Sequence, residues 1–118
     1  MSKVAIKVTP GFGFEVLDIE ENFLPTMQGA VEGLIQPIDY NDNLTIWVNE
    51  EFYSLSDPDV NFVATSFYAA LGVDRPLLGN AVFTGGTDED GEVLGLTPEL
   101  HEAIVEIVLE AQEYAATM

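Results

Sequence analysis

Large aliphatic residues occupy every second position in two short segments, and this alternation commits the chain to a fold that contains a sheet. The apolar members are Val4, Ile6 and Val8 in the first segment and Leu44, Ile46 and Val48 in the second. Successive side chains of a strand point to opposite faces, so a period of two marks a strand with one buried face. We expect both segments to be strands.

Turn-forming residues place a partner strand beside each of these segments. Pro10-Gly11-Phe12-Gly13 separates the first segment from residues 14–18, which we expect to return as the other arm of a hairpin. Asn41-Asp42-Asn43 joins residues 34–40 to the second segment in the same way. A short apolar run over residues 79–84 is typical of a buried strand.

Two segments carry clear signals for a helix. Residues 23–32 follow a candidate N-cap, Asn22, and precede Gly33, which stands where a glycine often ends a helix. Near the C-terminus, Thr97 is a favoured N-cap residue and Pro98 suits the first helical position, so we expect a helix to begin there.

A further helix is predicted to open at Asp57-Pro58 and to run to Leu71, with Gly72 ending it. Its apolar face would consist of Val60, Ala64, Phe67 and Leu71. The expected order is then β-β-α-β-β-α-β-α. This order predicts a single α+β domain over residues 1–118, with an antiparallel or mixed sheet and about three helices packed on it.

The charge of the chain is extreme. Twenty-one acids face three bases, for a formal net charge of −18. The bases are Lys3, Lys7 and Arg75, too few and too dispersed to grip the phosphates of a nucleic acid or an anionic membrane. We expect neither direct nucleic-acid binding nor membrane docking. A protein of this charge is attracted instead to basic surfaces.

The residues available for catalysis are few. The sequence has no cysteine, which excludes thiolate nucleophiles and suits a reducing compartment. His101 is the single histidine, and one histidine on a helix supplies no nucleophile–base pair. We therefore expect a non-enzymatic protein without a cofactor. The N-terminus lacks the continuous apolar stretch of a signal peptide, so the cytoplasm is the expected location.

Five glutamates recur at spacings of three and four in the last helix and form what we call the glutamate stripe: Glu99, Glu102, Glu106, Glu110 and Glu113. Residues at these spacings lie above one another on a helix. An apolar arc is expected beside the stripe, formed by Leu100, Ala103, Ile104, Ile107, Val108, Ala111 and Tyr114. The stripe is either a solvated helix face or a rod of carboxylates that imitates nucleic acid.

Two apolar residues of this helix, Val105 and Leu109, fall outside both the arc and the stripe. They are expected either to contact another element of the domain or to form a small exposed patch. Such a patch would suit a partner protein or a second copy of the chain.

Two other segments are candidate ligand sites. Asp88, Asp90 and Glu92 lie in an acidic loop over residues 85–91 and beyond, although the loop fails the pattern of an EF-hand. They are weak candidates for a divalent cation, and Asp90-Gly91 is equally typical of a simple turn. The glycine-rich strand 79–86 is the other candidate, through Gly79, Asn80, Thr84 and Gly85, because glycines allow close approach of a ligand to the backbone.

Several short motifs occur together and in order: Val31-Glu32-Gly33-Leu34-Ile35, Val48-Asn49-Glu50-Glu51, Asn61 with Ala64-Thr65, Gly79-Asn80-Ala81-Val82 with Thr84-Gly85, and Asp90-Gly91-Glu92. Over residues 15–97 the chain resembles a family of small acidic proteins, classed as a domain of unknown function, that is common in bacteriophages, especially those of actinobacteria. One departure is Phe52-Tyr53-Ser54, where that family tends to have a glycine-containing turn. The resemblance implies no activity or cofactor. It implies a phage gene product acting in a bacterial cell.

Three functional hypotheses follow. The first is a phage accessory protein that binds a basic host protein through an acidic, DNA-mimic-like surface. The second is a protein that binds or sequesters a small ligand or nucleotide at the glycine-rich strand. In the third, the acidity only serves solubility or adaptation to salt, which the scarcity of lysine suits and the abundance of bulky apolar residues does not.

Overall fold

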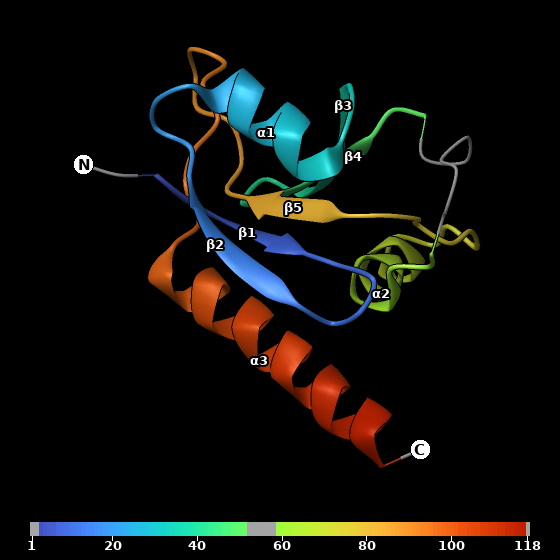
Figure 1. Ribbon diagram of the computed structural model, residues 1–118. Helices are drawn as coiled ribbons and strands as arrows, with labels where there is room; N and C mark the ends of the chain where they lie inside the picture. Colours follow the sequence, from blue (N-terminus) through green and yellow to red (C-terminus); the bar gives the residue numbers. More distant parts are fainter. Residues whose placement is uncertain (1–2, 52–58, 118) are drawn as a thin grey trace.

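The computed structural model describes residues 3–51 and 59–117 and has the element order expected from the sequence (Figure 1). Its strands are β1 (Val4–Val8), β2 (Phe14–Asp18), β3 (Ile35–Asn41), β4 (Leu44–Asn49) and β5 (Ala81–Thr84). Its helices are α1 (Phe23–Val31), α2 (Phe62–Ala70) and α3 (Pro98–Ala116). The strands form one antiparallel sheet in the order β2-β1-β5-β4-β3. The α+β class is confirmed, with the antiparallel form of the sheet.

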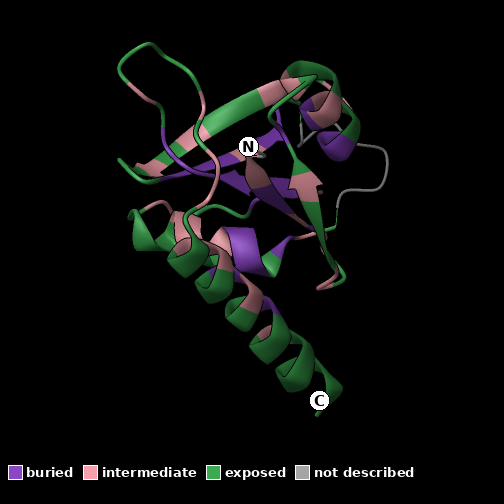
Figure 2. Cartoon of the chain, turned by 90° about the vertical axis from the view of Figure 1, so that its left-hand side faces the viewer, coloured by how far each residue is buried: buried purple, intermediate pink, exposed green. Residues whose placement is uncertain are grey.

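Helices cover both faces of this sheet, with α1 on one face and α2 and α3 on the other (Figure 1). The alternation in β1 explains the two layers, because neighbouring residues enter different cores. Ala5 packs with Met27 and Val31 of α1, whereas Ile6 and Val8 pack with residues of α2 and α3. The buried strands lie between the two layers (Figure 2).

The helix predicted to open at Asp57-Pro58 begins later than expected. Asp57-Pro58 lies outside the described residues, and Val60, placed on the helix by the sequence, instead forms a bridge with Leu78. The helix begins at Phe62, where Asn61 accepts a hydrogen bond from the amide of Ala64 at 3.1 Å. A side-chain cap in an extended conformation, that of Asn61, marks the start of α2.

The helix over residues 23–32 is confirmed as α1, but its two ends differ from the predicted chemistry. Asn22 occupies the N-cap position in a left-handed conformation and forms no side-chain capping bond. At the other end, Glu32 has the positive φ of 61° that was expected of Gly33. Gly33 is needed for space, because a Cβ there would lie 2.5 Å from the side-chain nitrogen of Asn49.

Candidate functional site

The helix that carries the glutamate stripe begins where the sequence predicts. The side chain of Thr97 accepts a hydrogen bond from the amide of Leu100 at 3.2 Å, and Pro98 occupies the first turn. The cap satisfies one of the amides that have no partner within a helix. These two residues therefore fix the first turn of α3, from which the positions of the later glutamates around the helix follow.

The stripe lies opposite the buried face of α3 and not beside it. Ile104 and Val108 are buried, and His101, Val105 and Ala111 are half-buried along the same line. Ala103, Ile107 and Tyr114, which the predicted apolar arc included, are exposed. The arc was wrong on this flank because α3 packs through a narrow line of residues, and its last turns extend beyond the sheet (Figures 1 and 2).

All five members of the glutamate stripe are exposed. Within residues 3–51 and 59–117, none of them forms an ion pair or a hydrogen bond through its side chain. With a rise of about 1.5 Å per residue, the stripe is about 21 Å long. From Thr84 onward the sequence has nine acids and neither lysine nor arginine. The stripe is thus a continuous negative surface without a neutralising neighbour on its own helix.

The apolar pair that fell outside the predicted arc divides between the two expected roles. Val105 packs against the core formed by β1, β4, β5, α2 and α3, so it contacts other elements of the domain. Leu109 is 48% exposed and stands at the border of the stripe. Of the exposed patch predicted for these two residues, only Leu109 remains.

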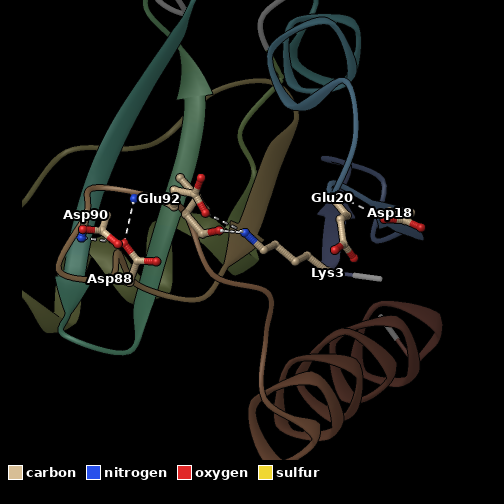
Figure 3. A network of polar contacts seen from close by, with 7 residues as sticks. Lys3, Asp18, Glu20, Asp88, Asp90 and Glu92 are labelled. Atoms are coloured by element: carbon tan, nitrogen blue, oxygen red, sulfur yellow. Dashed lines mark hydrogen bonds and ion pairs between the residues drawn. The ribbon is translucent and has the colours of Figure 1, made fainter. Parts of the chain in front are cut away.

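The acidic loop after β5 is held together by one of its own carboxylates, that of Asp88 (Figure 3). Asp88 Oδ1 accepts hydrogen bonds from the amides of Asp90 at 2.8 Å and Glu92 at 2.9 Å. Gly91 takes a positive φ of 83° and donates to the carbonyl of Asp88, as in the turn predicted for Asp90-Gly91. The carboxylate of Asp88 thus serves to order the loop.

Glu92 points away from that turn toward the N-terminal strand (Figure 3). Its Oε2 lies 3.7 Å from Nζ of Lys3, which also donates to the carbonyl of Val93 at 3.1 Å. Asp88, Asp90 and Glu92 do not converge, and across the described part of the chain no group of three or more acids and histidines is arranged to hold a metal ion. The geometry gives the cation hypothesis no support.

The glycine-rich segment uses its polar groups inside the protein. Asn80 donates to the carbonyl of Ala30 at 3.0 Å. Buried Thr84 accepts from the Trp47 indole at 2.8 Å and donates to the carbonyl of Gly85. A Cβ at Gly85 would clash with the carbonyl of Gly95. The close backbone approach that Gly85 allows is therefore to the chain itself, and the side chains of Asn80 and Thr84 bond within the domain.

Gly79 has a similar internal role. It adopts a positive φ of 79°, and its carbonyl accepts from the side chain of Asn61 at 2.9 Å. Asn61 also donates to the carbonyl of Val8 at 3.0 Å, which ties the start of α2 to both β1 and the segment before β5. Gly79 therefore helps to connect α2 to the sheet.

Asparagines were missed as structural residues in the sequence. Asn49 donates to the carbonyls of Val31 and Glu32 at 3.1 and 3.2 Å and accepts from the amide of Glu51 at 2.8 Å. With Asn80 bonding Ala30, it satisfies the free carbonyls at the end of α1. The available signal was that these asparagines stand inside apolar strands and motifs, where polar side chains need buried partners.

The model of one protein family, the domain of unknown function DUF3846, matches residues 1–109. The chain belongs to this family. The match is wider than the residues 15–97 that carried the resemblance, since it includes β1 and most of α3. No curated protein and no solved structure matches the sequence.

Membership in DUF3846 assigns no activity, so the roles of the motif residues come from the fold. Asn49, Asn61 and Asn80 connect helix ends to strands, and Gly33 and Gly85 allow segments to touch. These motifs explain how the domain is built. The glutamate stripe is exposed and takes no part in these internal contacts.

Proposed function

We propose that this chain is a non-enzymatic accessory protein of a bacteriophage that acts in the host cytoplasm by binding a host protein with a basic surface. The contact is made by the glutamate stripe of α3. The carrying observation is that five exposed carboxylates, Glu99 to Glu113, lie on one helix face opposite the core with no ion-pair partner among the described residues. A surface of this kind remains available to a partner after the domain has folded.

The cost of the stripe supports a role for it. Like charges at helical spacings of three and four oppose folding by about 0.2–0.5 kcal/mol per pair. The stripe has four such successive pairs, which amounts to about 1–2 kcal/mol. Domains are stable by only about 5–15 kcal/mol, so this is a considerable fraction.

The charge density of the stripe suits a site that normally receives nucleic acid. Five carboxylates over about 21 Å give one charge per about 5 Å, compared with one per about 3.4 Å along each strand of duplex DNA. A cleft lined by lysine and arginine would attract the stripe by the same long-range forces that attract DNA. The proposed target is therefore a nucleic-acid-binding host protein.

Two observations support a protein as the target in preference to a nucleic acid or a membrane. The chain has only three lysines and arginines, so counterion release from phosphates would supply little affinity. In residues 3–51 and 59–117, no helix combines the length and the apolarity that a membrane span requires.

The proposal is tested by capture of binding proteins from a bacterial lysate on the immobilised chain. Retained proteins are eluted with increasing salt and identified by mass spectrometry. We expect a basic protein that elutes at moderate ionic strength, because screening weakens exposed charge pairs. We also expect duplex DNA to compete with the immobilised chain for that protein.

Matched charge variants locate the contact. Replacing Glu102, Glu106 and Glu110 by Gln should abolish retention of the basic protein. The control replaces Glu32, Glu50 and Glu89 by Gln, which changes the net charge equally at exposed positions outside α3. Equal retention by the two triple variants would show that the stripe is not the contact.

A further inference from the structure

β2 forms one free edge of the sheet, and its backbone leaves alternate residues unpaired. The amide of Ile19 donates to the carbonyl of Lys3, and the amide of Thr9 donates to the carbonyl of Gly13. These bonds fix the parity of the ladder, so the odd-numbered residues of β2 bond to β1. The amides and carbonyls of Phe14, Val16 and Asp18 therefore point away from the sheet, and none of them has a partner among the described residues.

The other edge of the sheet is protected in a way that β2 is not. Just before β3, the carbonyl of Leu34 accepts a hydrogen bond from the amide of Glu50, and the register of β3 with β4 then places the nitrogen of Pro37 on the outward side. Proline has no amide hydrogen, and the register of β3 also shifts between Asp39 and Asn41. Proline and bulges are common devices against unwanted pairing of edge strands. β2 has no proline and pairs with β1 in a regular register throughout.

The side chains along β2 combine apolar exposure with negative charge. Phe14 is 38% exposed and Val16 is 50% exposed, although their partners Val8 and Ile6 are fully buried. The segment from Phe12 to Asn22 contains four acids and no base: Glu15, Asp18, Glu20 and Glu21. An occupant of this edge would thus have to supply a pairing backbone, apolar side chains and positive charge.

We propose that β2 is a docking edge for an extended segment of a basic partner protein, which adds to the sheet as an antiparallel strand. This is a second contact surface, formed by Phe14, Val16 and Asp18, and it is independent of the glutamate stripe. Opposite Phe14, Val16 and Leu17 the added strand carries apolar residues. Opposite Glu15 and Asp18 it carries lysine or arginine. Cross-strand pairs of these kinds stabilise a sheet, as the added backbone bonds also do.

Charge repulsion disfavours a second copy of the chain as the partner that pairs with β2. Each copy has a net charge of −18, and two β2 strands would bring two acidic segments together. Like charges across an interface oppose association, whereas a basic strand gains from the same field. The edge therefore selects against self-association while remaining open to a basic strand.

The register dictates the test peptide. Reading antiparallel to β2 from Asp18 to Phe14, the matching sequence is Lys-Val-Val-Lys-Val, to which a lysine is added at each end for solubility. Titration of the isotope-labelled full chain with this peptide is followed by NMR. We expect slowed hydrogen exchange at the amides of Phe14, Val16 and Asp18, with α3 unaffected.

Two methylated peptides separate strand addition from charge attraction. Methylating the amide nitrogen of the valine opposite Val16 removes a donor that points at β2, and binding should weaken by at least about tenfold, which corresponds to 1.4 kcal/mol. Methylating the following lysine alters an amide that points away, and binding should be retained. The two peptides have identical composition and charge, so equal affinities would overturn the proposal.

Protein variants give the reciprocal test. Val16→Pro removes an outward amide and keeps the bonds to β1, and it should abolish peptide binding, whereas Val16→Thr keeps that amide and should retain most of it. Circular dichroism checks that both variants fold. The Glu102, Glu106 and Glu110 to Gln variant should still bind the peptide, which separates this test from that of the proposed function.

Two outcomes would count against the basic strand as occupant. The first is peptide-induced change confined to α3, which would indicate charge attraction alone. The second is self-association of the free chain in sedimentation that Val16→Pro removes, without peptide binding. That result would assign the edge to a second copy.

Discussion

Asn49, Asn61 and Asn80 connect the ends of helices to the sheet by donating to backbone carbonyls. Asn61 is 1% exposed and Asn49 is 6% exposed. Buried amide side chains of this kind are stable only where their partners are in place, so each asparagine specifies one arrangement of two elements. Individual residues thus help to determine how α1 and α2 pack on the sheet, together with the helices' own apolar faces.

Gly33 and Gly29, at and near the end of α1, provide a matched pair of substitutions. Gly33→Ala places a Cβ 2.5 Å from Asn49, whose side chain is held by three hydrogen bonds, so we expect a loss of about 1–3 kcal/mol. Gly29→Ala meets no atom within 4 Å on an exposed helix face and should stabilise by up to about 1 kcal/mol. Chemical denaturation of both variants measures the difference. Equal stabilities would show that Asn49 can move at little cost.

At the scale of elements, the start of α3 was predicted correctly from the sequence, whereas the face that it buries was not. Thr97 and Pro98 determine where the helix begins through local chemistry that any sequence reader can find. The direction of its buried face depends on which strand and helix it meets. His101 and Val105 lie toward the core, whereas Ile107 and Tyr114 do not. The distribution of apolar residues around a helix does not by itself show which of its faces is buried.

The glutamate stripe should lower the stability of the protein in a salt-dependent manner. Replacing Glu102, Glu106 and Glu110 by Gln removes every like-charge pair of the stripe, so we expect a gain of about 1–2 kcal/mol at low ionic strength. The gain should largely vanish in high salt, where the charges are screened. Thermal unfolding at both ionic strengths measures it. A similar gain from Gln at Glu32, Glu50 and Glu89 would indicate that net charge alone is responsible.

At the scale of the whole molecule, the acidity divides into regions with different roles. Asp88 orders a loop, Glu92 pairs with Lys3, and the glutamate stripe remains open to solvent. Two clusters of buried apolar residues, one on each face of the sheet, form the core of the domain. On the proposed function, the open stripe is a binding surface, and the acidity is not a general adaptation to salt.

The chain should therefore fold at low ionic strength. Self-repulsion of a net charge of −18 lowers stability, and added salt should raise the melting temperature by a few degrees through screening. Circular dichroism at about millimolar and about molar salt compares the two states. Loss of secondary structure at low salt would instead support adaptation to salt as the reason for the acidity.

The sequence by itself determined the elements and their order, because strand alternation and helix caps are local signals. β1, β2 and α3 were predicted from such signals with their correct bounds or starts. The acidic loop and the glutamate stripe could also be found, since charge is a property of composition. What these patterns lacked was any information on contacts between residues distant in the chain.

Only the tertiary structure decided which acidic residues are open and which are used. It placed the stripe opposite the core, joined Asn61 and Gly79 by a hydrogen bond, and left β2 at a free edge beside β1. Such outcomes depend on the strand order β2-β1-β5-β4-β3, in which neighbours in space are far apart in sequence. Pairing across that distance is set by packing of the whole sheet, which no short motif encodes.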